Sequence, residues 1–283
     1  MQLYLGIDGG GTGCRAAIAE AGGQILGMGQ AGPANIASDP SGARDNILIA
    51  ATEALSAAVG AVRVPALLPT LHAGLGLAGA NAAGAVARLC ASLPFAAISV
   101  ASDAVAAMKG ALGTQDGIVA VLGTGSVFAR QQAGHIHQIG GWGLVLGDEG
   151  SGAWLGRSLL AASVAAQDGF RPLTPLLRQV LADHGGAEGV IGFAVTARPA
   201  DFAGLAPAVL ASDDPAALAI LALADQAVTA SIALLQPVGP PLAVTFIGGI
   251  GPTFAGRLAG SWPVRGAEGS ALDGALSLAR GAG

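Results

Sequence analysis

Short apolar runs alternate with glycine-rich turns along the first third of the chain. Runs at 3–7, 14–19 and 24–28 follow one another closely, and Gly22-Gly23 is a turn signal between the last two. This spacing predicts three antiparallel strands in a meander. Further along the chain, segments with the apolar pattern of a helix alternate with segments that have the pattern of a strand. They predict a helix at 39–59 capped by Asp39 or Ser41, a strand at 67–77, a helix at 81–93, a strand at 96–101 and a helix at 102–112.

The same order begins again at residue 117. A strand at 117–122 ends in Gly123-Thr124-Gly125-Ser126, and strands at 127–131 and 136–139 follow. Residues 151–236 are mostly helical in pattern, with a last strand at 242–247 and a terminal helix at 269–280. A strand, a turn rich in glycine and threonine and a returning strand therefore occur twice. Two similar halves with facing hairpin loops predict a cleft that grips a polyphosphate from both sides.

Composition narrows the class of protein. The 283 residues allow one large domain or two small ones, and only 11% are charged. The uncharged run 64–87 is interrupted by prolines, His72, Asn81 and glycines, so we expect no membrane-spanning helix there. With no signal peptide and only Cys14 and Cys90, a reducing cytoplasm is the expected location. A net charge of −5 and a single lysine disfavour nucleic acid as a partner.

The first turn has the chemistry of a phosphate site. Glycines at 9–11 can offer bare N–H groups to an anion, and Thr12 adds a hydroxyl. Asp8 would repel phosphate unless a divalent cation lay between them, as Mg²⁺ does between carboxylates and phosphates. The chain has no GxxxxGK[ST] motif, so a Walker-type ATPase is excluded, and neutral donors with Mg²⁺ are expected to carry the phosphates. Turns 9–12 and 123–126 could instead be plain hairpins without a ligand.

Six motifs together resemble the N-acetylglucosamine and glucosamine kinases. This group is close to the BadF/BcrA-type ATPases and lies within the actin/Hsp70/hexokinase superfamily. The resemblance spans nearly the whole chain and implies an α/β fold of two ribonuclease-H-like (actin-like ATPase) domains with an interdomain cleft. The expected domains are 1–112, joined by the C-terminal helix 269–283, and 113–268 with a helical insertion. The motifs are 6–12, 33–35, 102–104, 123–126, 140–152 and 248–250.

The resemblance assigns roles to particular residues. Asp103 is the expected catalytic base that accepts the proton of the sugar 6-hydroxyl. Asp8 is expected to hold Mg²⁺ through water, beside ATP. The other expected nucleotide contacts are Gly9, Gly10, Gly11, Thr12, Thr124, Gly125, Gly248 and Gly249. The expected sugar contacts are Asn35, Asp103, Ser126, Gly141, Trp142, Asp148 and Glu149.

Each of these assignments has a structural alternative. Asp103 could be a helix cap, Trp142 an ordinary core residue, and Asp148-Glu149 the cap of the helix from Ser151. The carboxylates suit a sugar because they accept hydrogen bonds from neighbouring hydroxyls. The four histidines show no metal-ligand spacing, so no zinc site is expected. In this the chain departs from the ROK sugar kinases, which carry a zinc-binding cysteine cluster.

These features favour a cytoplasmic kinase that phosphorylates the 6-hydroxyl of glucosamine or N-acetylglucosamine with MgATP. Which sugar is used stays open, and a homodimer is also open. One alternative is an ATPase activator of the BadF/BcrA kind, whose bridging cluster needs thiolates that Cys14 and Cys90 are not placed to supply. The other is a sugar-sensing, non-catalytic protein on the same fold, which would need a DNA-binding module that the acidic sequence does not show.

Overall fold

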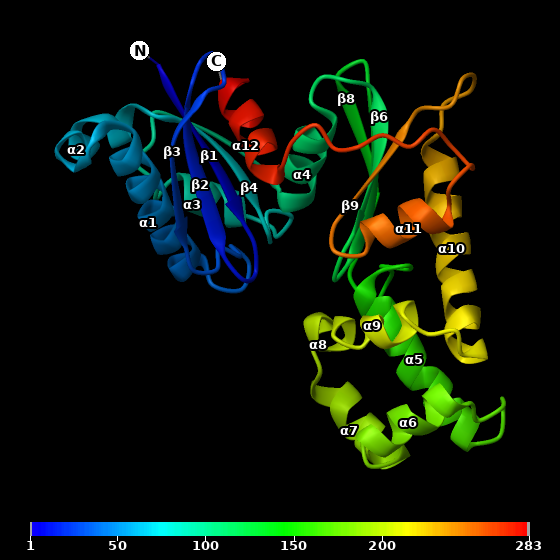
Figure 1. Ribbon diagram of the computed structural model, residues 1–283. Helices are drawn as coiled ribbons and strands as arrows, with labels where there is room; N and C mark the ends of the chain where they lie inside the picture. The colour runs from blue at the N-terminus through cyan, green and yellow to red at the C-terminus, as the bar shows by residue number, and fades with distance from the viewer. Residues whose placement is uncertain (1, 282–283) are drawn as a thin grey trace. The chain divides into compact units, whose positions relative to one another are not determined.

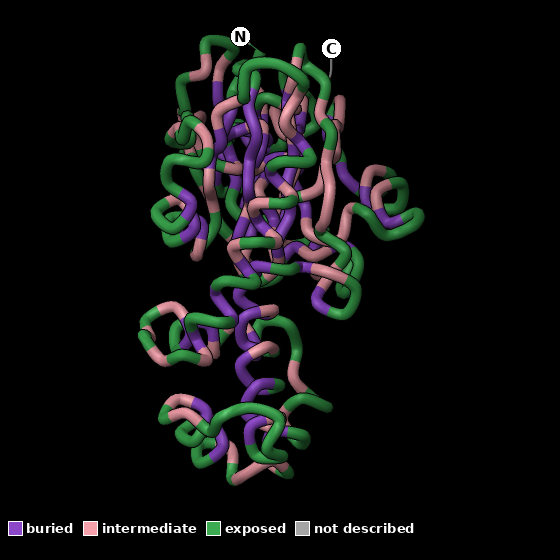
Figure 2. Tube along the Cα trace, turned by 90° about the vertical axis from the view of Figure 1, so that its right-hand side faces the viewer, coloured by how far each residue is buried: buried purple, intermediate pink, exposed green. Residues whose placement is uncertain are grey.

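The computed structural model describes residues 2–281 and contains two compact α/β units (Figure 1). Unit 1 comprises Met1–Thr114 together with Ala267–Gly283, and unit 2 comprises Gln115–Gly266. The chain thus leaves unit 1 once and returns to it for its last helix. Buried residues gather along the strands and on the inner helix faces of each unit (Figure 2).

Unit 1 is built on a five-stranded sheet in the order β3-β2-β1-β4-β5. The first three strands form the predicted antiparallel meander, and β4 and β5 run parallel to β1. Parallel strands present their carboxyl ends at one edge, so residues that follow β1, β4 and β5 gather there. The strands are β1 (Leu3–Gly9), β2 (Cys14–Glu20), β3 (Ile25–Ala31), β4 (His72–Leu77) and β5 (Ala97–Ser102).

Helices cover this sheet with very close backbone contacts. Helix α1 (Pro40–Val59), capped by Asp39, packs against β3 and β2, while α4 (Asp103–Leu112) and α12 (Ala271–Arg280) pack together against β1 and β4. A Cβ atom at Gly74 would lie 2.0 Å from the carbonyl oxygen of Ala275. Glycine in β4 therefore lets α12 lie directly on the strand.

Two predicted elements of unit 1 are wrong in part. The strand predicted at 67–77 begins only at His72, because the preceding residues form η1 (Ala61–Arg63), α2 (Val64–Leu67) and η2 (Leu68–Thr70). Pro65 and Pro69 stand in the first turns of α2 and η2, where a missing N–H costs nothing. The helix predicted at 81–93 is only α3 (Ala85–Cys90). It begins after Gly84, whose φ of +71° lies outside the helical region.

Unit 2 repeats the first four strands of this plan. Its sheet has the order β8-β7-β6-β9, with three antiparallel strands and β9 parallel to β6. The predicted repeat of the strand, turn and returning strand is therefore confirmed. Its strands are β6 (Gly117–Leu122), β7 (Ser126–Gln132), β8 (His135–Gly140) and β9 (Val244–Ile247).

The remaining core of unit 2 is helical. Leu155 and Leu159 of α5, together with Val228 and Ile232 of α10, are fully buried with Leu122 of β6 in one hydrophobic cluster. The helices are α5 (Gly152–Gln167), α6 (Pro175–Asp183), α7 (Ala187–Thr196), α8 (Pro199–Ala203), α9 (Ala206–Leu210), α10 (Pro215–Leu235) and α11 (Gly251–Arg257).

Helix α10 was not singled out by the sequence patterns. Among residues 2–281 it is the one single helix whose length and mean hydropathy of 1.9 would suit a membrane span. It packs against α5, α9, β6 and β7, and its inner face belongs to the core of unit 2. Its apolar character therefore has a structural explanation on the inner face, whereas its outer face is exposed.

Candidate functional site

Two predicted carboxylates lie at the same edge of the unit 1 sheet. Asp8 is paired in register with Gly76 of β4, and Gly76 with Ala101 of β5. Asp103 follows two residues later, as the first residue of α4. Two strand spacings separate β1 from β5, about 10 Å. Asp8 and Asp103 therefore lie within reach of one polyphosphate and its acceptor.

Asp8 has a partner that the sequence patterns did not identify. Arg15 lies directly opposite Asp8 in the β1–β2 register, and its Nη2 donates to Asp8 Oδ2 at 2.5 Å. The Asp8 side chain is 15% exposed, whereas that of Arg15 is 61% exposed. The expectation of neutral donors and Mg²⁺ alone did not include this arginine, whose exposed guanidinium lies beside the loop. The register of the hairpin would have predicted this pair, because residues 8 and 15 face each other in a tight antiparallel hairpin.

The turn between these two residues suits a phosphate group. Gly10 N–H closes it by donating to the Gly13 carbonyl at 2.9 Å, and Gly10 O accepts from Ala34 N–H at 2.9 Å. A Cβ at Gly11 would meet no atom within 4 Å, and Gly11 and Thr12 are exposed. Within residues 2–281, no hydrogen bond engages the N–H groups of Gly11 and Thr12. They remain available to an anion.

Asn35 is held close to the same turn. Its Oδ1 accepts from the N–H groups of Ala37 and Ser38 at 3.0 and 3.2 Å. Its neighbour Ala34 is bonded to Gly10, so the segment is fixed to the glycine turn. With Oδ1 committed to the backbone, the amide NH₂ of Asn35 is the group that can donate to a ligand.

Asp103 has the electrostatic character expected of a proton acceptor. Burial raises the pKa of its carboxyl, and the negative charge of Asp8 raises that pKa further, against hydrogen bonds from backbone N–H groups, including that of Ala104. Ser102, and not Asp103, caps α4, because Ser102 Oγ accepts from Val105 N–H at 3.2 Å. The cap is therefore supplied without Asp103, and one oxygen of its carboxylate is free of the helix.

Unit 2 gathers most of the predicted sugar residues around one cavity of about 300 Å³. Its polar lining consists of two carboxylates and two hydroxyls, and its apolar lining is formed largely by aromatic and branched side chains. A cavity with a few convergent polar groups on an apolar wall is typical of a small-molecule site. The polar residues are Ser126, Asp148, Glu149 and Ser231, and the larger apolar ones are Phe128, Ile139, Trp142 and Leu146.

Asp148 is the most constrained residue of this cavity. It is buried and has a φ of +63°, a conformation that is costly for residues other than glycine. Its carboxylate accepts from Gly143 N–H at 3.2 Å and from the Ser126 backbone, while burial raises its pKa. The carboxylate thus ties the 140–147 segment to the second glycine turn. Such strain is a common feature of ligand-binding positions.

The second glycine turn is fixed to its surroundings by several hydrogen bonds. Gly123 N–H donates to Gly125 O at 3.0 Å, and Gly123 O accepts from Gly152 N–H at the start of α5. A Cβ at Gly125 would lie 2.8 Å from Asp148 Oδ2. The turn at Gly248 lies against the end of the same strand, since Ile250 N–H donates to Leu122 O at 3.1 Å. Three predicted nucleotide residues, Thr124, Gly125 and Gly248, therefore share one sheet edge with Gly249.

The structure decides two of the alternatives. Trp142 is 74% exposed and lines the cavity, so it is not a core residue. Helix α5 is capped by Ser151, whose Oγ accepts from Trp154 N–H at 3.1 Å, so Asp148 and Glu149 are not its caps. Of the predicted sugar residues, the cavity brings Ser126, Trp142, Asp148 and Glu149 together. Gly141 lies next in the chain to Trp142 but is not a lining residue, and Asn35 and Asp103 belong to unit 1.

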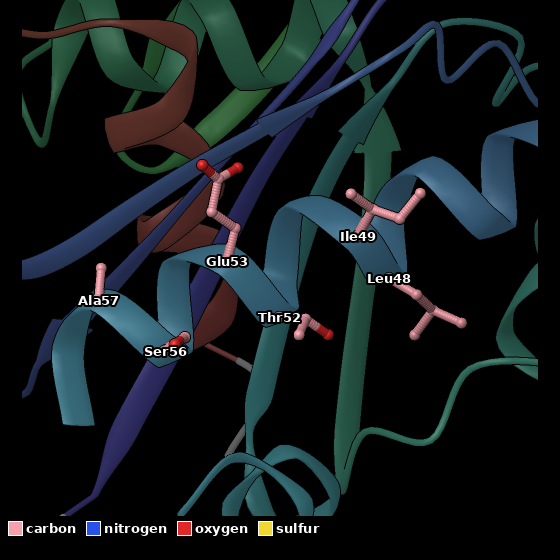
Figure 3. A pocket seen from close by; sticks show the side chains of 6 residues that line it. All are labelled: Leu48, Ile49, Thr52, Glu53, Ser56 and Ala57. Atoms are coloured by element: carbon pink, nitrogen blue, oxygen red, sulfur yellow. The ribbon is translucent and has the colours of Figure 1, made fainter. Parts of the chain in front are cut away.

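Other features of the described residues carry less chemistry. The larger hollow on α1, about 760 Å³, is lined by one helix, and its single carboxylate, Glu53, accepts from Gln30 N–H at the sheet edge (Figure 3). Residues 2–281 contain no cluster of three or more histidine, cysteine or acidic side chains that could hold a metal. Burial raises the pKa of Cys14 to about 12, so its thiol is unreactive at neutral pH.

The chain is similar to several known proteins. The chain is 35% identical over 227 residues to glucosamine kinase GspK of Vibrio cholerae, covering 78% of this chain and 76% of that protein. A Chromobacterium violaceum structure provisionally named an N-acetylglucosamine kinase superposes with a TM-score of 0.83 at 32% identity, covering 99% of each chain. A ROK family glucokinase of Streptomyces griseus shares the fold, with a TM-score of 0.50 at 19% identity and 99% of each chain covered.

The family assignment follows from the extent of the match as well as from these relatives. The model of one family matches residues 5–251, which contain the glycine turns of both units, Asp8, Asp103 and the cavity of unit 2. The chain therefore belongs to the BadF/BadG/BcrA/BcrD ATPase family.

Proposed function

We propose that this protein is an ATP-dependent kinase of glucosamine or N-acetylglucosamine, acting on the 6-hydroxyl. The observation that carries the proposal is the placement of Asp8, Arg15 and Asp103 around an open glycine turn at one sheet edge. The sugar class rests on the relatives, which are named as kinases of these two hexosamines. A carboxylate cavity in unit 2 supports it, because carboxylates can accept from several sugar hydroxyls.

Asp103 acts as the general base in this proposal. Its carboxylate accepts the proton of the sugar O6 while O6 forms a bond to the γ-phosphorus and the bond to the β-phosphate oxygen breaks. The products are the sugar 6-phosphate and ADP, and the proton leaves Asp103 afterwards. A raised pKa helps, since the protonated product state of the base is then less costly.

Asp8, Arg15 and the first glycine turn hold the phosphates. The donor set fits Mg²⁺, since a largely buried carboxylate adjoins a turn with open N–H groups, and Mg²⁺ would neutralise phosphate charge when bound. Arg15 must then leave Asp8, at least in part, and its exposed guanidinium can donate to a phosphate oxygen. The turns at Thr124, Gly125, Gly248 and Gly249 supply uncharged donors to the nucleotide.

The cavity of unit 2 holds the sugar. Asp148 and Glu149 accept from its hydroxyls, Ser126 adds a hydroxyl, and Gly141 and Trp142 form the wall segment beside them. Asn35 donates its amide from unit 1. A cytoplasmic location suits this activity.

An assay of ADP release tests the proposal and its substrate. Purified protein with MgATP is given glucosamine, N-acetylglucosamine, N-acetylmuramic acid or glucose. We expect slow ATP turnover without sugar and a strong increase with one of the first two. Rapid ATP turnover that is indifferent to every sugar would contradict the kinase and favour an ATPase of the activator kind.

A further inference from the structure

The outer face of α10 is an uncharged apolar stripe along the whole helix. Figure 1 shows α10 beside the sheet of unit 2, and its inner face packs there while the outer face does not. Three leucines on the outer face, Leu218, Leu223 and Leu234, are 48%, 56% and 73% exposed. Apolar patches of a few hundred square ångströms are often functional surfaces. The other exposed residues of the stripe are Ala219, Ala222, Gln226, Ala230 and Ala233.

The sequence of this stripe is symmetric about Gln226 except at Leu223, whose counterpart is Thr229. Leu218 and Leu234 each lie eight residues from Gln226, on opposite sides. Ala219 and Ala233 each lie seven residues away, and Ala222 and Ala230 each lie four away. A twofold interface requires this property, because residue i of one copy must fit residue j of the other and the reverse. A stripe selected to fit a different protein has no reason to be symmetric.

We propose that α10 pairs antiparallel with α10 of a second copy of this chain, with the twofold axis at Gln226. Leucine then meets leucine at both ends, and the alanines on either side of the axis let the two helices approach closely. At the axis the two Gln226 amides can exchange N–H···O bonds, since each carries both a donor and an acceptor. The outermost prolines, Pro215 and Pro237, are also nearly symmetric, each eleven residues from the axis.

The charges on and near α10 argue against a membrane surface as the partner of this face. Helix α10 contains no lysine or arginine, and its one internal carboxylate, Asp225, is bonded to Arg257 through both oxygens at 2.9 and 2.6 Å. Asp213 and Asp214 precede the helix. Helices that lie on membranes carry basic residues on the polar flank, and anionic lipid would repel these aspartates. An uncharged stripe is therefore matched best by the same uncharged stripe.

The area of the outer face of α10 limits the expected affinity of the dimer. A helix of 21 residues is about 32 Å long and about 10 Å across, so one face offers about 300 Å². Stable interfaces bury about 800 Å² per partner. Helix α10 alone therefore predicts a weak dimer, whose population rises with protein concentration.

Sedimentation velocity over a concentration series tests the pairing. We expect a monomer–dimer equilibrium in the unaltered chain and a monomer at all concentrations for Ala222→Glu. Ala222→Glu with Ala230→Arg should restore the dimer, because each new carboxylate meets the new guanidinium of the other copy. Within one helix these positions are eight residues, about 12 Å, apart and do not pair. Ile49→Glu, on the exposed face of α1 shown in Figure 3, is the matched control and should leave the equilibrium unchanged.

Cross-linking tests the position of the axis. In a Cys90→Ser background, Gln226→Cys should form an intermolecular disulfide on mild oxidation, since only residues with Cα atoms closer than about 7 Å can be bridged. Leu218→Cys should not, because its two copies would lie about 24 Å apart. Cys14 is buried and does not compete.

Three results would overturn the proposal. They are a monomeric protein at every concentration, a dimer that Ala222→Glu leaves intact, and a double variant that remains monomeric although it folds normally. Binding of the monomer to vesicles of neutral phospholipid would assign the face to a membrane surface instead. Dimerisation is measured without substrates, so its outcome is independent of the proposed kinase activity.

Discussion

At the tip of its first hairpin, unit 1 places Asp8 opposite Arg15, whereas the corresponding pair in unit 2 is Val121 opposite Val127. The two hairpins share their strand pairing, and each is followed by a strand parallel to its first one. Only unit 1 has charges there. Unit 2 instead brings a carboxylate from outside the hairpin, Asp148, against the turn. In the proposed function the same scaffold serves two purposes, reaction chemistry in unit 1 and ligand recognition in unit 2.

The largest effect should come from the base of unit 1. Asp103→Asn keeps the size of the side chain and the bond to Ala104 N–H but cannot accept the sugar proton. We expect kcat to fall by about 10²–10⁴-fold, the usual size of general-base catalysis. Sugar and nucleotide affinities, measured by calorimetry, should change little. Near-native turnover would leave Asp103 a structural residue only.

Arg15 tests whether the charges of unit 1 act on the nucleotide. Arg15→Ala should weaken MgADP binding and lower kcat/KM for ATP by about 10-fold or more, because one charge-assisted donor to phosphate is lost. Arg15→Lys should recover part of the effect. Stability should change by about 1 kcal/mol, because the Arg15 side chain is 61% exposed and water can take its place beside Asp8. Arg63→Ala, an exposed arginine elsewhere in unit 1, is the control; equal effects of both would remove Arg15 from the site.

Asp148 tests the recognition role of unit 2. Asp148→Asn tolerates positive φ and keeps an oxygen for Gly143 N–H, but loses the charge. We expect KM for the sugar to rise about 10-fold with kcat and ATP affinity little changed. Asp148→Gly relieves the backbone strain and should retain the fold while weakening sugar binding further. If either variant changed the ATP affinity and not that of the sugar, the division of labour between the units would be wrong.

The smallest effect concerns the ionisation of the Asp103 carboxyl and its effect on the stability of the fold. The pKa of Asp103 is raised in the fold, so its proton is held more tightly there than in the unfolded chain. Ionisation at neutral pH therefore costs stability, and that stability is present at acid pH and lost as pH rises through the raised pKa. Asp103→Asn should melt higher than the unaltered protein at pH 7, with the difference shrinking towards pH 4.

A substitution at Asp8 isolates the effect of its charge on the pKa of Asp103. Asp8→Asn removes the negative charge that raises the pKa of Asp103, so carbon-detected NMR should show this pKa falling. Burial, the larger cause, remains. An unchanged pKa would mean that the two carboxylates do not interact across β4.

Much of this architecture follows from local sequence. Asp39, one of the two expected caps, caps α1, and β6 ends at its glycine turn where expected. The strand β1 runs two residues beyond the expected 3–7, to Gly9. The run at 67–77 failed because apolar content alone does not separate a strand from short helices begun by proline. Hydrophobic pattern reports burial and does not by itself distinguish a strand from a short helix.

The parts of the site that escaped prediction depend on contacts distant in the chain. Arg15 required the hairpin register, and the positive φ of Asp148 required the packing of the 140–147 segment on the second turn. The exposure of Trp142 and of the outer α10 leucines cannot be read from an apolar side chain, because tertiary packing decides which face is covered. The chemistry-bearing residues were recognisable, but not their partners.

The central claim, that the protein transfers the γ-phosphate of ATP to a hexosamine, is tested most directly by identifying the product. The protein is incubated with MgATP and each hexosamine, and ³¹P NMR follows the phosphorus. The account predicts a sugar 6-phosphate and ADP in equal amounts, with almost no free phosphate, and no such product from Asp103→Asn. Free phosphate as the main product, at a rate that is the same with and without sugar, would contradict it.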